Sequence, residues 1–124
     1  MNQEVTRLSD YLEHMLQAID RILRYVDELT EPGFLANELV QDAVIRNFEI
    51  IGEASRNIER HFPEFAAANQ DLPLVAAYEM RNALAHGYFK VDFEIVWKTI
   101  QNDLPGLRRH VASLAGQLAG GGTG

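Results

Sequence analysis

The chain has 124 residues, the length of one ordinary domain, and carries a net charge of −7 at neutral pH. This acidic charge argues against broad, non-specific binding of nucleic acids, and we expect no DNA partner. The chain contains no cysteine, which excludes disulfides and thiolate metal sites. No signal peptide and no apolar run long enough to span a bilayer is visible, so we expect a cytoplasmic protein without a membrane partner.

Apolar residues recur every three or four positions along the first quarter of the chain. This spacing predicts a helix of about twenty-five residues, which we expect Glu31-Pro32-Gly33 to end, because proline cannot continue a helix. A second helix is expected from near Asn37 to His61. Its apolar residues occupy more than one side, which indicates a helix that is both central in the fold and covered by a partner chain.

The second half of the chain also has helical spacing. His61-Phe62-Pro63 is expected to end the second helix, and Ala66 to Asp71 to form a small polar connection. A short third helix is expected to run from Asp71, a plausible N-cap, through Ala85. Gly87 follows, where a left-handed residue often ends a helix.

Asp92 is expected to cap a fourth helix, with a kink or break near Pro105 and Gly106. No alternating strand pattern of useful length is present. The sequence therefore predicts an all-α fold, an antiparallel up-down bundle of four main helices in one domain of residues 1–119. We expect this bundle to form a dimer and residues 120–124 to be a flexible tail.

Polar side chains gather in the segment Met80 to Phe89. Arg81 and Tyr88 are seven residues apart and share one side of a helix, and Asn82 and His86 share another. Arg81 and His86 are about 140° apart on a regular helix, so this spacing permits a shared site without requiring one.

Together, a histidine and an arginine can cleave RNA without a metal ion. His86 can act as general acid or base, and Arg81 can hold the phosphate while a ribose 2′-hydroxyl attacks it. The residue types equally allow a structural role, with His86 favoured by the negative end of a helix and Arg81 paired with an acidic residue. Composition and spacing leave both interpretations open.

The segment Arg81–Tyr88 resembles the R-x4-H-x-Y signature of HEPN-domain toxins of the HepT family. The resemblance covers about residues 5 to 112. Members usually carry a proline-tryptophan pair before the signature, where this chain has Leu72–Ala77. Further resemblance lies in Asp42–Ala54 for the second helix, Tyr88–Asp92 and Ile95–Trp97 for the entry to the last helix, and Asp103–Pro105 for its interruption.

This resemblance implies the toxin of a type VII toxin–antitoxin system, a metal-independent endoribonuclease with an RNA substrate such as transfer RNA. Arg81 and His86 would be its catalytic residues in a homodimer whose two signatures face one cleft. The partner would be an MNT-type nucleotidyltransferase antitoxin, which transfers AMP to Tyr88. The negatively charged adenylate would block RNA sterically and by repulsion.

A polar stripe along the second helix is a weaker candidate for function. Its members form ion pairs with one another in one interpretation. In the other they face the dimer cleft, where Arg46 or Arg56 could meet RNA phosphates and Glu53 could orient Arg81; Asn82, which shares a helix side with His86, is a further supporting candidate. No metal-ligand spacing and no phosphate-binding loop is present, so we expect no metal and no cofactor. The stripe consists of Arg46, Glu49, Glu53, Arg56 and Arg60.

A second hypothesis belongs to a different class of function. The chain would be a non-catalytic helical dimer that serves as a scaffold or binding partner of a nucleotidyltransferase. Arg81 and His86 would then be structural, or would bind a nucleotide without cleaving it. Loss of His86 alone separates the two hypotheses, because a nuclease needs its general base and a scaffold does not.

Overall fold

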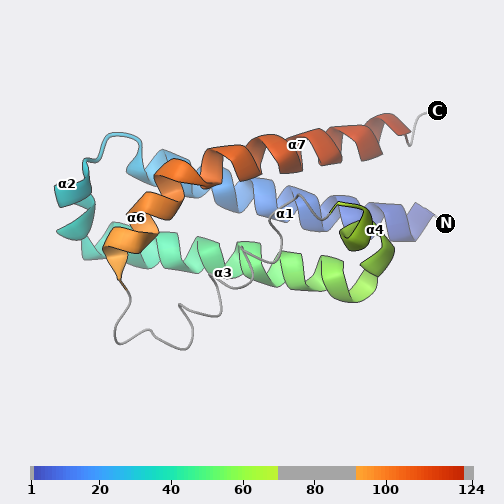
Figure 1. Cartoon of the computed structure of the whole chain (residues 1–124), viewed down its shortest axis with the longest axis horizontal. Coiled ribbons are helices and arrows are strands. Elements are labelled where there is room, and N and C mark those ends of the chain that lie inside the picture. Colours follow the sequence, from blue (N-terminus) through green and yellow to red (C-terminus); the bar gives the residue numbers. More distant parts are fainter. Residues whose placement is uncertain (1, 70–91, 122–124) are drawn as a thin grey trace.

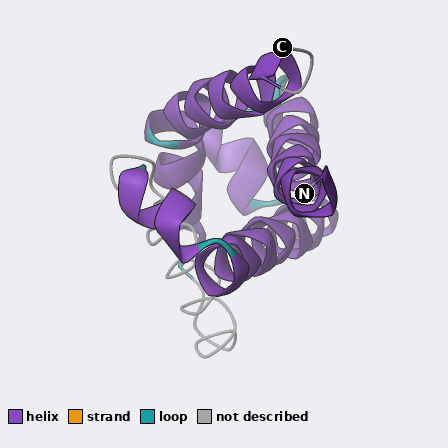
Figure 2. Cartoon of the chain, turned by 90° about the vertical axis from the view of Figure 1, so that its right-hand side faces the viewer, coloured by secondary structure: helices purple, strands orange, loops and turns teal. Residues whose placement is uncertain are grey.

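The computed structural model describes residues 2–69 and 92–121, and these residues form six helices and no strand. Three helices are long and lie alongside one another (Figure 1): α1 (Asn2–Val26), α3 (Glu38–His61) and α7 (Leu104–Gly121). Figure 2 looks along these helices and shows α1 between α7 and α3, and α1 packs against both. The described residues confirm an all-helical fold, in which α1 is the middle one of the three long helices.

Three shorter helices close the ends. Helix α2 (Glu31–Leu35) packs against α3 and α6, and α6 (Phe93–Asn102) also packs against α7, while α4 (Pro63–Ala68) packs against α3. Helix α1 runs antiparallel to α3 and to α7 (Figure 1). The expected third helix, residues 71–85, lies outside the described residues, so the four-helix arrangement and the dimer stay predictions. No described helix is long and apolar enough to cross a membrane.

Helix α1 has the expected length of 25 residues, but it ends earlier than expected, at Val26. The expectation that Glu31-Pro32-Gly33 ends this helix is wrong, because these residues lie inside α2. Thr30 caps α2, since its hydroxyl accepts a hydrogen bond from the Gly33 amide at 3.3 Å. Pro32 fits there because the first turn of a helix needs no amide donor.

The expected second helix is confirmed as α3. The Asn37 side chain accepts a hydrogen bond from the Val40 amide at 3.1 Å and so caps the helix, which ends at His61. The expected connection from Ala66 is wrong in its first part, because α4 includes Ala66–Ala68. Pro63 opens α4, and alanine has the highest helix propensity of any residue.

The last expected helix is confirmed with its cap and its break. The Asp92 carboxylate accepts hydrogen bonds from the amides of Glu94 and Ile95, at 3.0 and 3.3 Å. The break falls at Asp103, between α6 and α7, and places Pro105 in the first turn of α7. Helix α7 continues to Gly121, two residues into the tail that was expected from residue 120.

An aromatic cluster joins α2 to α6, and a buried amide joins α2 to α3. The Phe34 ring lies 6.1 Å from that of Phe93 and 5.4 Å from that of Trp97, measured between centroids. The Gln41 amide donates hydrogen bonds to the carbonyls of Phe34 and Leu35, at 2.9 and 3.0 Å. These contacts fix the start of α3 and so position the polar stripe that α3 carries.

The described helices share one hydrophobic core. Every described helix except α4 contributes fully buried apolar side chains. Helix α1 supplies the longest stripe, as its spacing predicts. The buried apolar residues are Leu8, Leu12, Met15, Ala18, Ile19, Ile22 and Val26 in α1, Phe34 in α2, Val44, Phe48, Ile51, Ala54 and Ile58 in α3, Val96 and Ile100 in α6, and Leu104, Leu107, Val111 and Leu114 in α7.

Candidate functional site

The six candidate residues divide into two groups. Arg81, Asn82, His86 and Tyr88 lie outside the described residues, so their roles stay predictions. The supporting candidates Arg46 and Glu53 are described, and both line one groove. This groove is therefore the part of the candidate site that the described residues form.

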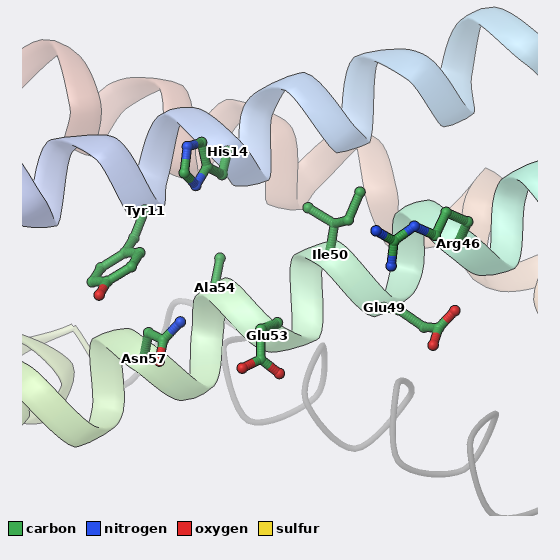
Figure 3. A pocket seen from close by; sticks show the side chains of 8 residues that line it. All are labelled: Tyr11, His14, Arg46, Glu49, Ile50, Glu53, Ala54 and Asn57. Atoms are coloured by element: carbon green, nitrogen blue, oxygen red, sulfur yellow. The ribbon is translucent and has the colours of Figure 1, made fainter.

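The groove lies between α1 and the polar stripe of α3 and has a volume of about 480 Å³. Figure 3 shows that α1 contributes one wall and α3 the other. Helices α1 and α3 pack against each other through their buried apolar stripes. The groove lies beside this contact, where mostly polar side chains of the two helices face solvent. The groove is lined by Tyr11, His14, Arg46, Glu49, Ile50, Glu53, Ala54 and Asn57.

The interior of the groove differs from its rim. Ile50 and Ala54 extend from α3 toward α1, and the Arg46 guanidinium extends along the groove beside Ile50 (Figure 3). The carboxylates of Glu49 and Glu53 instead point away from α1 (Figure 3). The groove therefore offers an apolar surface and one cation inside, with its acidic groups outside.

Arg46 is exposed and carries no ion pair with another described residue. Glu49, Arg56 and Arg60 also carry no ion pair with another described residue, so the interpretation of this stripe as a ladder of ion pairs fails for them. Among the described residues, a salt bridge forms between Asp20 of α1 and Arg108 of α7. A cation without a carboxylate partner is available to an anionic ligand.

Tyr11 stands at the opposite end of the groove from Arg46 (Figure 3). Its ring packs edge-on against Phe62, with 6.4 Å between centroids, and is half-buried. Phe62 is the residue that caps the end of α3, so the geometry of this cap also holds the tyrosine. His14 stands exposed on α1 between these two ends.

Sequence reasoning singled out Arg46 and Glu53 but not Tyr11, His14 or Asn57. Tyr11 and His14 are three positions apart, which places them on one side of α1. The sequence carries no signal for which flank of α1 faces α3, so it cannot assign them to this groove.

A second hollow, of about 530 Å³, lies at the corner between α3 and α4. Arg7, His61 and Glu64 are among the residues that line it, and it contains none of the candidates. Within residues 2–69 and 92–121, no three histidine or acidic side chains gather as a metal ion requires.

Comparison with known proteins identifies the family. The family model described as "Ribonuclease HepT-like" matches residues 15–114, a range that contains Arg81, His86 and Tyr88. The chain belongs to the HepT-like ribonuclease family. The match extends over most of the described helices, including all of α3 and α6.

Relatives of known name agree with this family. A protein of Thermococcus cleftensis named "Probable ribonuclease HepT" is 40% identical over 99 residues, which cover 80% of this chain and 87% of that protein. A longer protein of Methanocaldococcus jannaschii, named "Gamma-glutamylcyclotransferase and putative RNase", is 36% identical over 108 residues, 87% of this chain and 47% of that protein. No solved structure matches the chain.

Proposed function

We propose that this HepT-like protein is a metal-independent endoribonuclease, the toxin of a type VII toxin–antitoxin system. The observation that carries the proposal is the family match over residues 15–114, which includes the segment Arg81–Tyr88. The names of the two relatives support ribonuclease activity. Metal independence and the toxin role rest on the chemistry of the signature residues and on the resemblance.

The proposed reaction needs two side chains. His86 takes the proton of a ribose 2′-hydroxyl, which attacks the adjacent phosphorus and expels the 5′-oxygen of the next nucleotide. Arg81 binds the phosphate and stabilises the charge that develops on it. The leaving 5′-oxygen takes up a proton from water, so the products are a 2′,3′-cyclic phosphate and a free 5′-hydroxyl. Asn82 and Glu53 have supporting roles in the proposal, Glu53 by orienting Arg81.

The proposed partners follow from the same resemblance. The protein acts as a homodimer on RNA, with transfer RNA as the leading substrate. A nucleotidyltransferase antitoxin transfers AMP to the Tyr88 hydroxyl and thereby blocks the cleft with a bulky anion. A selective RNA substrate suits a chain of net charge −7, because local positive groups must overcome the overall repulsion.

A cleavage assay on total RNA in EDTA tests this proposal. Protein shown by mass to carry no AMP is compared with His86→Ala and Arg81→Ala. The controls are His61→Ala in α3 and Arg109→Ala in α7, which make the same changes at exposed positions. We expect discrete cuts with cyclic phosphate ends, reduced at least a hundredfold in both signature variants. Acid–base catalysis by His86 contributes about 10²–10⁴-fold, and the loss of one group that stabilises transition-state charge, here Arg81, costs about 10²–10³-fold. The controls should cut like the wild type.

The same assay can favour the non-catalytic hypothesis. If AMP-free protein cuts no RNA, or if His86→Ala cuts as well as His61→Ala, the nuclease proposal is wrong. Binding of a cognate nucleotidyltransferase by the His86→Ala protein would then support a scaffold.

A further inference from the structure

We propose that the groove between α1 and α3 binds one nucleotide of an RNA strand, with the base against Ile50, Ala54 and Tyr11 and the phosphate on Arg46. The choice of RNA as ligand rests on the proposed function. The site itself is defined by described residues only and includes neither Arg81 nor His86.

The size of the groove suits this ligand. Its volume of about 480 Å³ lies within the range of roughly 300–1,000 Å³ that is typical of small-molecule sites. Such sites combine an apolar surface with a few polar groups that fix the orientation of the ligand. Ile50 and Ala54 form the apolar surface here, and Tyr11 and Arg46 stand at its two ends (Figure 3).

Tyr11 provides an aromatic face for a base. Aromatic side chains bind single-stranded RNA by stacking, which tolerates any base. Because the Tyr11 ring already packs against Phe62, with 6.4 Å between centroids, it loses little freedom when a base binds. Asn57 lines the same wall as Ala54, where its amide can pair with a base edge.

Arg46 provides the contact to a phosphate. Its guanidinium points along the groove, and no described carboxylate lies within salt-bridge distance of it. A guanidinium binds phosphate with two parallel hydrogen bonds, and these are stronger than hydrogen bonds between neutral groups. The imidazole of His14 lines the same groove and adds a second donor.

The carboxylates of Glu49 and Glu53 leave the interior of the groove to Arg46. Both point away from α1 (Figure 3), so neither lies against a base that packs on Ile50 and Ala54. A bare anion such as inorganic phosphate would meet the negative charge at the rim and gain nothing from the apolar surface. Base stacking and the Arg46 contact then act together on one ligand.

Fluorescence anisotropy with a labelled single-stranded 2′-O-methyl RNA tests the proposal, since this RNA lacks the hydroxyl that the cleavage reaction needs. The full chain is compared with Arg46→Ala and Tyr11→Leu. The matched controls are Arg109→Ala on α7 and Tyr25→Leu on α1, both outside the groove. Circular dichroism checks that each variant is folded.

We expect Arg46→Ala and Tyr11→Leu each to weaken binding about tenfold, from the loss of a charged contact or a stacked base. The two controls should stay within twofold of the wild type. Arg46→Ala should also reduce the salt dependence, the slope of log K against log salt concentration, by about 0.7, the contribution of one phosphate on a single strand. Equal affinities and slopes for Arg46→Ala and Arg109→Ala would overturn the proposal, whatever happens to Tyr11→Leu.

A second arm separates a strand from a free nucleotide. Binding of 5′-AMP is measured by calorimetry on the wild type and Arg46→Ala. If Arg46→Ala loses AMP but keeps its affinity for the RNA, the ligand is a free nucleotide and the proposal of an RNA site is wrong. Cleavage is measured separately. If RNA binding depends on Arg46 but no RNA is cut, the nuclease proposal is wrong and the proposal of an RNA site in the groove stands.

Discussion

The two flanks of α1 meet their neighbouring helices in different ways. On the flank toward α7, an ion pair from Asp20 to Arg108 spans the boundary between the helices. On the flank toward α3, Tyr11 and His14 stand beside a groove. Both flanks border the same buried apolar stripe. The difference teaches that the stripe holds the fold together, while the polar residues beside it decide whether the surface is bridged or left open for a ligand.

The largest contrast is expected between two neighbouring isoleucines of α3. Ile51 is fully buried, whereas Ile50 is half-buried and lines the groove. Ile51→Ala should lower the free energy of unfolding by about 2–4 kcal/mol, because it leaves a cavity in a packed core. Ile50→Ala should cost about 1 kcal/mol, because less apolar surface is removed from water there. Urea denaturation of both variants measures the difference, and equal losses would mean that the groove is packed as tightly as the core.

Two amides sharpen the comparison further. Gln41 is buried and donates to two carbonyls of α2, whereas Asn57 lines the open groove. Gln41→Ala should lower stability by about 1–3 kcal/mol, because the Phe34 and Leu35 carbonyls lose their side-chain donor. Asn57→Ala should change it by less than about 0.5 kcal/mol. Thermal unfolding of the pair is the measurement, and a larger loss for Asn57→Ala would contradict this account of the groove.

A stabilising change is expected on the outer side of α7. Gly116 is exposed within the helix, and a Cβ atom there would meet no described heavy atom within 4 Å beyond its chain neighbours and the backbone of its own helix. Gly116→Ala should raise stability by about 0.5–1 kcal/mol, because alanine loses less backbone freedom in a helix. A rise in the urea midpoint with an unchanged slope would confirm this effect. A fall would show that this side of α7 is covered.

The smallest effect is expected on the flank of α1 toward α7, where Asp20 and Arg108 form an ion pair. Asp20 and Arg108 are 47% and 44% exposed, so Asp20→Asn should lower stability by less than about 0.5 kcal/mol. The hydrogen bond and charge of Asp20 raise the pKa of Arg108 above its ordinary value. When folding raises the pKa of a base, the resulting stabilisation is fully present at every pH below the unfolded-state pKa. This stabilisation is lost only as the pH rises through the folded-state pKa.

This ion pair should therefore contribute equally between about pH 6 and pH 9 and should weaken with salt. Unfolding of the wild type and Asp20→Asn at low and high salt measures the contribution. A difference between the two proteins that grows with pH in this window would disagree with the assignment.

Much of the fold was predictable because helical signals are local. The period of α1, the Asn37 and Asp92 caps, and the break beside Pro105 each depend on residues within one or two turns. The errors arose where one signal has two meanings. Pro32 and Pro63 open short helices, although proline also ends them.

The candidate site was less predictable because it depends on helix packing. Arg46 and Glu53 belong to one periodic stripe, so the sequence could group them. Tyr11 joins them only because α1 turns that flank toward α3. A single sequence gives no direct measure of such a rotation. The catalytic assignment of Arg81 and His86 comes from the resemblance and stays a prediction.

The antiparallel course of α1 and α7 has a practical consequence. Helix α1 begins, and α7 ends, at the same end of the molecule, opposite α2 (Figure 1). Domains with neighbouring termini often tolerate circular permutation. A short linker from α7 to α1, with new termini opened in the exposed segment around Glu28, should give a protein that keeps its helical spectrum. Such a permutant would also allow a fluorescent label to be placed beside α2 without altering any residue of the groove.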